Sequence, residues 1–357
     1  MSNKAWSDFC DDLKAAGAFL TDDLVPRDAF TEAEGIRYLI RLLRFGTVNF
    51  LENSDTSRPK VLDPFNPNMK CKIGADNPDN IYQRMNVAGT RRYRISGTRG
   101  TAPLMTFGSK ANKLHIDGTF VSTGELDMVD VPVDEHGRFS FVVSKDRPES
   151  GAWLPISEET TNVLCRQSFQ DRSNEKAAEF RIQVLDEPSR PAPLDPVAFA
   201  AQLRMATSFV SGTAEKFADW TKMFMKRPNE IIDWGQELFQ DTGGDPTIFY
   251  LHGYWQLAPD EAWVIDSEVP DCEYWNFVLH NWWMESLDHE RANTYINNHT
   301  AKLNADGTVT IVVSATDPGV GNWISTDFHN EETALIRWVK ADHHPVPTSR
   351  VVKISDL

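Results

Sequence analysis

The chain has 357 residues, of which 41% are hydrophobic and 25% charged, and its formal net charge is −16. This composition is typical of a folded protein with room for two domains. A chain this acidic lacks the positive face that nucleic acids and anionic membrane surfaces require, so we exclude both as partners.

Residues 1–56 are predicted to form an N-terminal helical cap. Apolar residues recur at helical spacing over residues 4–21 and again over residues 29–51. In the second stretch we expect Ile36, Leu39, Ile40 and Leu43 to face a neighbouring sheet. The first residues have neither a basic start nor an apolar run, so no secretory leader is expected.

The remaining chain is predicted to hold two β-domains joined by helices. Residues 57–190 and 247–357 contain short alternating segments separated by turn residues, which is typical of antiparallel strands. Residues 191–246 predict a helical insert, with helices at about 195–211, 213–226 and 228–240. The insert is rich in aromatic residues and methionine, which indicates core packing or, alternatively, an adaptable apolar pocket.

An internal repeat links the two β-domains. Residues 137–153 align without a gap with residues 307–323, and seven of these seventeen positions are identical. Chance would give roughly one identity. A weaker correspondence pairs Tyr82 with Trp263 and Tyr93 with Tyr274. The predicted fold class is therefore α+β, mainly β, with two related antiparallel sandwich or jelly-roll domains, a helical cap and a helical insert.

The four cysteines and the absent motifs narrow the chemistry. No C-x-x-C pair is present, so we expect reduced thiols in a cytoplasmic protein. The sequence contains no G-x-S-x-G elbow, no phosphate-binding glycine loop and no H-E-x-x-H motif. We therefore expect no cofactor and no metal, although nine scattered histidines leave their convergence in space open.

The loop DPGVGNW is the first candidate for a functional site. Its tight turns are expected to bring Asp317, Asn322 and Trp323 together at a strand end. Arg337 on the following strand is expected to pair with Asp317. A structural salt bridge beneath a tryptophan is the alternative interpretation.

The first copy of the repeat differs from the second at this acid. It keeps Trp153 and Arg166 but has Arg147 where the second copy has Asp317. A purely architectural role predicts the same acid in both copies, so the difference favours a functional role for the second copy.

The segment 273–283 is the second candidate. Strand alternation puts Trp275, Phe277 and Leu279 on a core face. The opposite face is expected to line a ligand pocket and carries Tyr274, Asn276, Val278, His280 and Trp282. His280 is expected to form an acid–base pair with Glu285 or Asp317. A half-solvated sheet face is the alternative.

The segment 76–84 is the third candidate. Asx turns at Asp79 and Asn80 lead the chain into a strand, and we expect Tyr82 to lie near Tyr93 and Arg94. A structural entry to the first sheet is the alternative interpretation.

The C-terminal region resembles a known bacterial family, the domain of unknown function 1214. The residues that carry the resemblance are Asp306, Gly307, Asp317, Pro318, Gly319, Asn322, Trp323 and Arg337. The chain departs from the family pattern at residues 327–329, where Asp-Phe-His replaces a Gly-His pair. The resemblance implies β-domains with helices in a bacterial protein, and it implies no activity.

The sequence leads to one main functional hypothesis, a cofactor-independent lyase, hydratase or hydrolase for an apolar or amphipathic small molecule. The expected catalytic residues are Asp317, His280, Glu285 and Arg337. The expected substrate-binding residues are Tyr274, Asn276, Trp282, Asn322, Trp323, Tyr82 and Arg94. A non-catalytic protein that binds a lipid-like or carbohydrate ligand is the alternative. A third interpretation is a purely structural or assembly role, in which the aromatic faces are buried between the subunits of a homo-oligomer.

Overall fold

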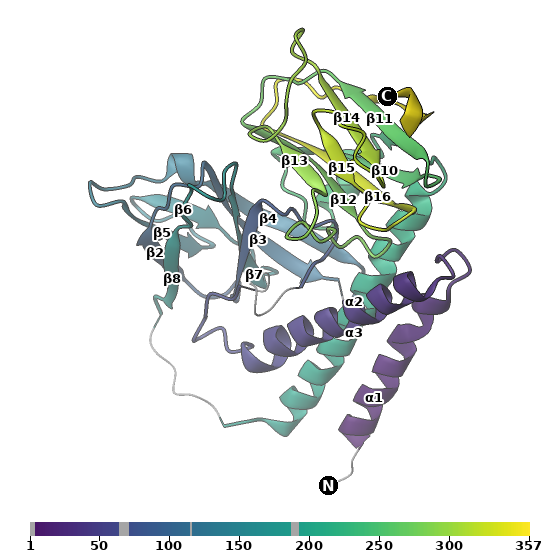
Figure 1. The fold of residues 1–357 in the computed structure, drawn as a ribbon. Coiled ribbons are helices and arrows are strands. Elements are labelled where there is room, and N and C mark those ends of the chain that lie inside the picture. The colour runs from purple at the N-terminus through teal and green to yellow at the C-terminus, as the bar shows by residue number, and fades with distance from the viewer. Residues whose placement is uncertain (1–3, 64–70, 115, 187–192) are drawn as a thin grey trace.

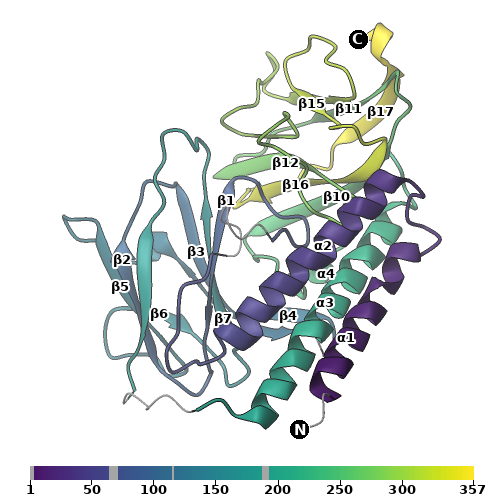
Figure 2. The same cartoon turned by 60° about the horizontal axis from the view of Figure 1, so that its bottom comes forward.

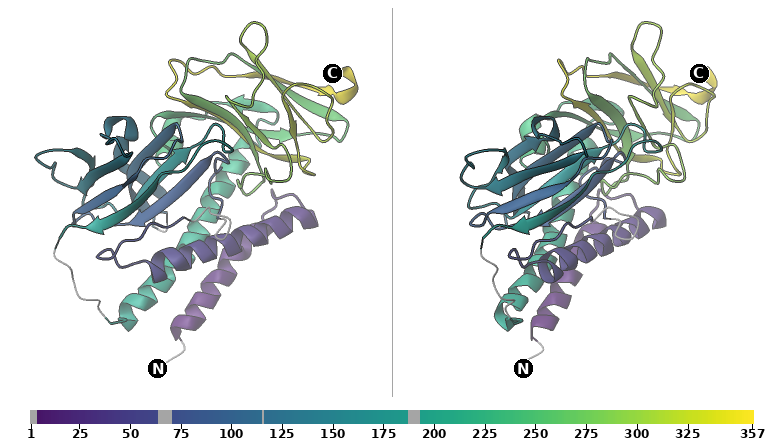
Figure 3. Two further views of the ribbon diagram at one scale, coloured as in Figure 1. Left: turned by 60° about the vertical axis from the view of Figure 1, so that its left-hand side comes forward. Right: turned by 90° about the vertical axis from the view of Figure 1, so that its left-hand side faces the viewer.

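The computed structural model describes residues 4–63, 71–114, 116–186 and 193–357. It contains two β-sandwiches and a layer of long helices that lies along one side of both (Figure 1 and Figure 3). The fold is mainly β, with four sheets whose strands are mostly antiparallel, so the predicted fold class is confirmed. Among the described helices, none combines the length and the apolarity that a bilayer crossing requires.

The helices come from two distant parts of the chain. The segments are α1 (Lys4–Ala16), a 3₁₀ turn (Gly17–Thr21), α2 (Ala29–Thr47), a π turn (Val48–Glu52), α3 (Pro196–Phe224) and the short α4 (Gln236–Gln240). Asp28 caps α2 by accepting bonds from two backbone N–H groups, and Asp195 caps α3 just before Pro196. In Figure 2, α3 lies between α1 and α2.

The helical insert differs from its prediction in two respects. Residues 196–224 form one helix, because Ser211 and Gly212 continue it where a break was expected. A glycine inside a helix costs about 1 kcal/mol, which burial of the α3 apolar face offsets. The expected helix over residues 228–240 is mostly wrong, since Glu230–Ile232 forms strand β9 before α4 begins.

The buried face of α2 matches its prediction only in part, because Leu39 and Leu43 pack partly buried against the core but two other residues do not. Ile36 and Ile40 are 48% and 60% exposed. Tyr38, Leu42 and Phe45 are buried instead, because α2 packs between α3 and the second sandwich. Helical spacing predicted the helix itself but did not identify which of two apolar stripes meets the core.

The first sandwich has two four-stranded sheets in the orders β1-β7-β3-β4 and β6-β5-β2-β8. Its strands are β1 (Asn80–Asn86), β2 (Tyr93–Thr98), β3 (Leu104–Lys113), β4 (Thr119–Asp127), β5 (Arg138–Ser144), β6 (Ala152–Pro155), β7 (Asn162–Ser168) and β8 (Glu179–Val184), with a 3₁₀ turn at Met128–Asp130. Alternate residues of both sheets fill the space between them, with Phe107 and Phe141 in edge-to-face contact.

The second sandwich has sheets in the orders β10-β16-β12-β13 and β15-β14-β11-β17. Its strands are β10 (Ile248–Gln256), β11 (Glu261–Ser267), β12 (Tyr274–His280), β13 (Tyr295–Asn297), β14 (Val309–Ser314), β15 (Trp323–Ser325), β16 (Glu331–Val339) and β17 (Thr348–Lys353), followed by a 3₁₀ turn at Ile354–Asp356. Trp275, Phe277 and Leu279 face its core, as their alternation predicted.

The two sandwiches have the same strand order, and we call strands at the same place in the two orders equivalent. In both, one pair of strands is parallel, and Val142 lies opposite Trp153 just as Val312 lies opposite Trp323. Both tryptophans donate their indole N–H to a serine carbonyl at the end of the neighbouring strand. The sequence repeat is therefore also a repeat of register and hydrogen bonds.

The weaker sequence correspondence was wrong. Tyr93 lies opposite Val143, and Trp263 lies opposite Val313, so Tyr93 is equivalent to Trp263. Tyr82 in β1 is equivalent to Tyr250 in β10. The error arose because the connections between equivalent strands differ in length.

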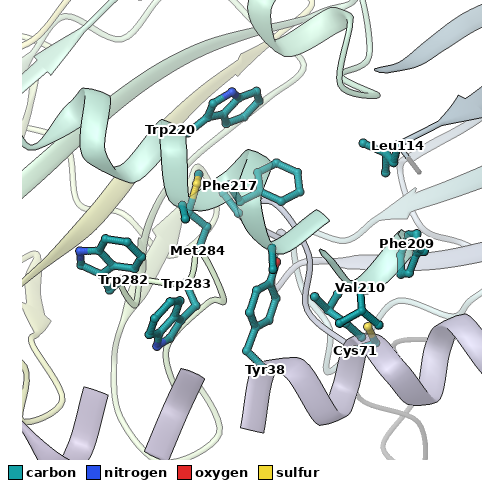
Figure 4. Close-up of a cluster of buried hydrophobic side chains, with 14 of the residues drawn as sticks. Tyr38, Cys71, Leu114, Phe209, Val210, Phe217, Trp220, Trp282, Trp283 and Met284 are labelled. Carbon is teal, nitrogen blue, oxygen red and sulfur yellow. The ribbon is translucent and has the colours of Figure 1, made fainter. Parts of the chain in front are cut away.

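A third core lies between the helices and the second sandwich. Tyr38 projects from α2 toward α3, while Trp282, Trp283 and Met284 come from the loop after β12 (Figure 4). Phe217 of α3 belongs to the same cluster. This core fixes α2 and α3 against the outward face of the sheet β10-β16-β12-β13, which is where the candidate site begins.

Candidate functional site

A cavity of about 170 Å³ lies where the outward faces of β1–β7 and β10–β16 meet α3. Its apolar walls include the side chains of Phe45, Leu114, Phe120, Phe209, Phe217, Trp220 and Phe239. Three arginines, one from β1, one from β7 and one from β16, also line it. The site thus combines an aromatic wall with buried positive charge.

Arg337 enters the cavity from β16 and is only 4% exposed. Its guanidinium donates to the backbone carbonyl of Ala75 and, at 3.4 Å, to Oδ1 of Asn276. Both acceptors are neutral. Within the described residues, Arg337 has no carboxylate partner.

Arg166 occupies the equivalent place in β7. It donates to the carbonyl of Gly243 at 2.5 Å, and its Nη1 lies 3.5 Å from Oδ2 of Asp245. Burial lowers the pKa of Arg166, but the Asp245 carboxylate together with smaller contributions from Tyr250, Glu125 and Tyr82 outweighs burial, and the pKa is raised. Arg166 is therefore a paired buried cation.

The backbone partners of the two arginines are also equivalent. The N–H of Asn77 donates to the Tyr82 hydroxyl at 3.2 Å, and the N–H of Asp245 donates to the Tyr250 hydroxyl at 2.9 Å. The loops before β1 and β10 thus have the same internal bonds, and each reaches across to the sheet of the other sandwich. Gly243 has φ of +95°, a conformation that a side chain would strain, and presents its carbonyl to Arg166.

The two halves differ in one charge. The loop before β1 has Asn77 at the position where the loop before β10 has Asp245. Oδ1 of Asn77 accepts from Nδ2 of Asn276 at 2.8 Å, and Asn276 in turn meets Arg337. An amide therefore replaces the carboxylate, and Arg337 keeps an uncompensated charge.

Arg84 is the third arginine, and it too lacks an ion pair with any residue that the structure describes. Its guanidinium lies 5.5 Å from the centre of the Phe45 ring and 5.7 Å from that of Phe120. Burial lowers the pKa of Arg84 to about 9. The guanidinium therefore stays charged at neutral pH, and its desolvation lowers the stability of the fold.

His252 of β10 is equivalent to Arg84 of β1. His252 lies opposite Leu335 in the β10–β16 pair, and Arg84 lies opposite Leu164 in the β1–β7 pair. Its ring stacks on Phe224 and Phe239 with centroid distances of 4.8 and 4.7 Å. Burial, with smaller contributions from His280 and Arg337, holds the pKa of His252 well below 6.5. The imidazole is therefore neutral, and its Nδ1 has no hydrogen-bond partner in the described chain.

The carboxylates near the cavity are already engaged. Asp76 lines it, but its two oxygens accept bonds of 2.8 Å from the backbone N–H and the hydroxyl of Ser286. Asp245 is held by Thr247 and Arg166. The walls therefore present two guanidinium groups that no carboxylate neutralises directly, which suits an organic anion with an apolar body.

Of the residues that the sequence suggested, Arg337 and Tyr82 line this cavity. Asn276 lies beside it as the link between Arg337 and Asn77. Tyr274 points into the same interface, where its hydroxyl donates to Oδ2 of Asp79 at 2.7 Å. The polar face of β12 is thus buried against the loop before β1, and the alternative of a half-solvated face is wrong.

The DPGVGNW loop lies apart from this cavity. Asp317 is exposed in the β14–β15 connection and accepts from the N–H of Gly319 at 2.7 Å. The expected pairing of Asp317 with Arg337 is wrong, because Arg337 points away from the other sheet into the domain interface. Asn322 and Trp323 make hydrogen bonds that tie strands and loops together.

The remaining candidates are distributed over the structure. His280 is buried at the end of β12, where its Nε2 lies 3.1 Å from the Asp76 carbonyl. Glu285 is paired with Arg41 at 2.6 Å, and Trp282 belongs to the helix-facing core. Arg94 is exposed on β2. Among the described residues, no hydrogen bond or ion pair joins the His280 side chain to Glu285 or Asp317, the partners expected for acid–base work.

Sequence reasoning missed the polar cavity residues Arg84, Arg166, Tyr250 and His252. The apolar pocket that was the alternative for the helical insert is present, because Phe209, Phe217 and Trp220 line the cavity. The repeat contained a usable signal, because Arg166 and Arg337 are its matching arginines. Treating both copies as parts of one site would have indicated a shared cavity. Arg84 and His252 had no such signal, since they fall outside the aligned segments.

Known proteins resemble this chain in sequence and in fold. Residues 257–342 match the model described as "Protein of unknown function (DUF1214)". The crystal structure of an uncharacterized protein from Burkholderia cenocepacia is 42% identical, covers 99% of this chain and 98% of its own, and superposes with a TM-score of 0.96. The C-terminal part of the chain, residues 257–342, therefore belongs to the DUF1214 family, as its sequence resemblance indicated.

A more distant structure shares the fold alone. The VPA0106 protein from Vibrio parahaemolyticus is 12% identical, with a TM-score of 0.51 over 97% of this chain and 99% of its own. No curated protein matches the chain.

Proposed function

We propose that the protein binds a small organic anion with an apolar body in the cavity between its two sandwiches. One observation carries the proposal: Arg84 and Arg337 are buried at the cavity wall without a carboxylate partner in the described chain. A buried charge without a counter-charge costs several kcal/mol. A bound carboxylate would offset that cost through charge-assisted hydrogen bonds.

The volume limits the size of the ligand. An apolar cavity of about 150 Å³ holds a benzene-sized molecule. The present cavity, of about 170 Å³, therefore suits an aromatic or short aliphatic acid better than a long lipid or a sugar chain. The rings of Phe217 and Trp220 would contact the apolar body, while the carboxylate would lie at the arginines.

Binding of matched acids and amides tests the proposal. Benzoate and hexanoate are titrated against the whole protein by calorimetry, beside benzamide and hexanamide, which have the same shapes without the charge. We expect both acids to bind at least tenfold more tightly than their amides. Arg337→Met should abolish the difference, whereas Arg94→Met, at an exposed arginine on the far sheet, should leave it unchanged.

Two outcomes contradict the proposal. Equal affinity for acids and amides would show that the guanidinium groups do not select the ligand. Tight acid binding that survives Arg337→Met but disappears in Arg94→Met would place the ligand outside the cavity.

A second candidate is that the protein converts this ligand as a lyase, hydratase or hydrolase. The observation that favours it is His252, a neutral imidazole at the cavity wall. Such a group can accept a proton from a bound substrate. His252 would then take the role that the sequence suggested for His280, with Arg337 holding the acid group.

His252→Asn separates the two functions. If the protein is an enzyme, this variant retains acid binding and loses conversion of the acid, followed by mass spectrometry of the incubated mixture. If the wild-type protein leaves a broad panel of small acids unchanged, the binding function alone remains.

Two further proposals concern origin and compartment. The shared strand order and register suggest that one ancestral sandwich was duplicated. Failure of the equivalent sheets to superpose would contradict this. The four cysteines are free thiols, which suits the reducing cytoplasm, and alkylation in intact cells would test it.

A further inference from the structure

Three titratable side chains from two distant segments of the chain converge beside the first turns of α2. They are Glu34 of α2, His329 of the β15–β16 connection and Glu332 of β16, and all three are buried. One ligand atom from each lies within 4.8 Å of the other two. Nε2 of His329 lies 3.1 Å from Oε2 of Glu34 and 3.8 Å from Oε1 of Glu332.

The histidine is oriented by a group outside the cluster. Nδ1 of His329 lies 3.0 Å from the carbonyl oxygen of Thr326. A carbonyl only accepts hydrogen bonds, so Nδ1 carries the proton. In the neutral ring, Nε2 then has a lone pair that points at carboxylate oxygen. This arrangement requires a positive species between the groups, either a proton or a metal ion.

Glu34 is held in the same manner as a metal ligand. Arg37 donates to its Oε1 at 2.7 Å, which leaves Oε2 turned toward His329. A hydrogen bond to one oxygen fixes the carboxylate and leaves the other oxygen for a cation.

Glu332 provides the independent observation. The residue is 1% exposed, and its Oε2 has no hydrogen-bond partner within the described chain. The free-energy cost of burying a carboxylate oxygen without a partner exceeds the net stabilisation by an ordinary hydrogen bond. A cation at the cluster would remove this cost.

We propose that Glu34, His329 and Glu332 bind one divalent transition-metal ion, such as Zn²⁺, Mn²⁺ or Fe²⁺. One imidazole nitrogen and two carboxylate oxygens suit these ions. Glu34 and His329 also line a cleft of about 690 Å³, so a water or ligand could complete the coordination from that side. The ion joins α2 to the second sandwich, beside which the first turns of α2 lie (Figure 2).

The competing arrangement is a protonated His329 with a neutral Glu332. The two differ in a measurable way, because metal binding displaces those protons into the buffer. The proposal is independent of the acid-binding cavity, since none of the three residues lines it.

The test uses the whole protein, treated with a chelator and titrated with Zn²⁺ and Co²⁺. We expect one equivalent of Zn²⁺ to bind with proton release, and the Co²⁺ complex to absorb visible light. Glu332→Gln should weaken Zn²⁺ binding about a hundredfold or more. It should leave the metal-free protein at least as stable as the wild type, because glutamine has the shape of the neutral acid.

Glu331→Gln is the matched control, because its neighbouring carboxylate bonds to Tyr254 and is not a member of the cluster. It should bind Zn²⁺ as the wild type does. The proposal is overturned if the wild type binds no stoichiometric Zn²⁺, or if Glu332→Gln binds it as tightly as the wild type. Glu34→Gln provides the same comparison from α2.

Discussion

Asn77 stands in one half of the molecule where Asp245 stands in the other. Both residues donate their backbone N–H to a tyrosine hydroxyl that lies opposite an arginine. Only Asp245 supplies a charge to its arginine. The two loops otherwise make the same internal hydrogen bonds. The carboxylate that is absent at Asn77 is therefore the specific difference between the two halves.

Replacing Asp245 with asparagine should make the second half resemble the first. Arg166 would lose its carboxylate, and we expect unfolding in urea to become easier by about 3 kcal/mol, since one partner of a buried pair is removed. Added benzoate should restore more stability to this variant than to the wild type, because a third arginine then lacks a counter-charge. Asp241→Asn in the same loop is the control and should behave as the wild type. A variant that loses stability but gains nothing from benzoate would argue against an anion site.

Replacing Arg84 with methionine should have opposite effects on stability and binding. Without ligand, the variant should be more stable by about 1 kcal/mol, because an unpaired buried cation gives way to an apolar side chain. The stabilisation by benzoate should fall at the same time. Thermal unfolding with and without benzoate measures both. A loss of stability in the ligand-free variant would indicate that Arg84 is structural.

Replacing Arg41 with methionine should expose the cost of burying Glu285. The two side chains are paired at 2.6 Å, and Glu285 is 1% exposed. Burial already raises the pKa of Glu285 above its ordinary 4.5, and loss of Arg41 should raise it further. A folded pKa above the unfolded one means that stability falls as pH rises from about 4.5. The fall should therefore be steeper in the variant, as urea unfolding at several pH values will show.

The double variant Arg41→Met with Glu285→Gln is the control for this prediction. It has no buried carboxylate, so its stability should recover at neutral pH, and its pH dependence should be flatter than that of the single variant. Equal pH profiles in all variants would indicate that Glu285 is neutral or solvated.

The sequence predicted the sheet faces better than the site. Alternation in β12 separated Trp275 and Phe277 from Tyr274 and Asn276, and the structure confirms that separation. The period of a strand is local, so it can be seen without knowing the neighbours. The neighbour that covers the polar face is the loop at residues 71–80, and its position depends on tertiary packing.

The most distinctive motif was misleading because turns have strong sequence signals. Pro318 and Gly319 shape the β14–β15 connection, and Trp323 closes it on Ser314. Trp153 does the same for Ser144 in the first sandwich. Repetition of the tryptophan thus reflects a repeated structural bond, while the cavity is made from residues that are scattered along the chain and have no local pattern.

Asp317→Asn should consequently have little effect. The side chain is exposed and bonds only within its own turn, so we expect a change in stability within about 0.5 kcal/mol. Benzoate affinity, measured by the same calorimetry, should be unchanged. A large loss of acid binding would return the DPGVGNW loop to the functional site and would contradict the assignment of the cavity.

Replacing His280 with glutamine should make the free energy of unfolding depend less on pH between neutral and acid conditions. Burial, followed by the charge of Arg337, lowers the pKa of His280 from 6.5 to about 3. Between these two values the unfolded chain binds a proton that the folded protein does not, so stability falls as pH decreases from 6.5 toward 3. One such group contributes about 1.4 kcal/mol per pH unit.

Glutamine can still donate to the Asp76 carbonyl, and it does not titrate. Urea unfolding from neutral to acid pH should show that difference in slope, while His136→Gln at an exposed site should match the wild type. Parallel profiles for His280→Gln and the wild type would mean that this imidazole takes up its proton inside the fold, and that the polar face of β12 is more hydrated than its burial indicates.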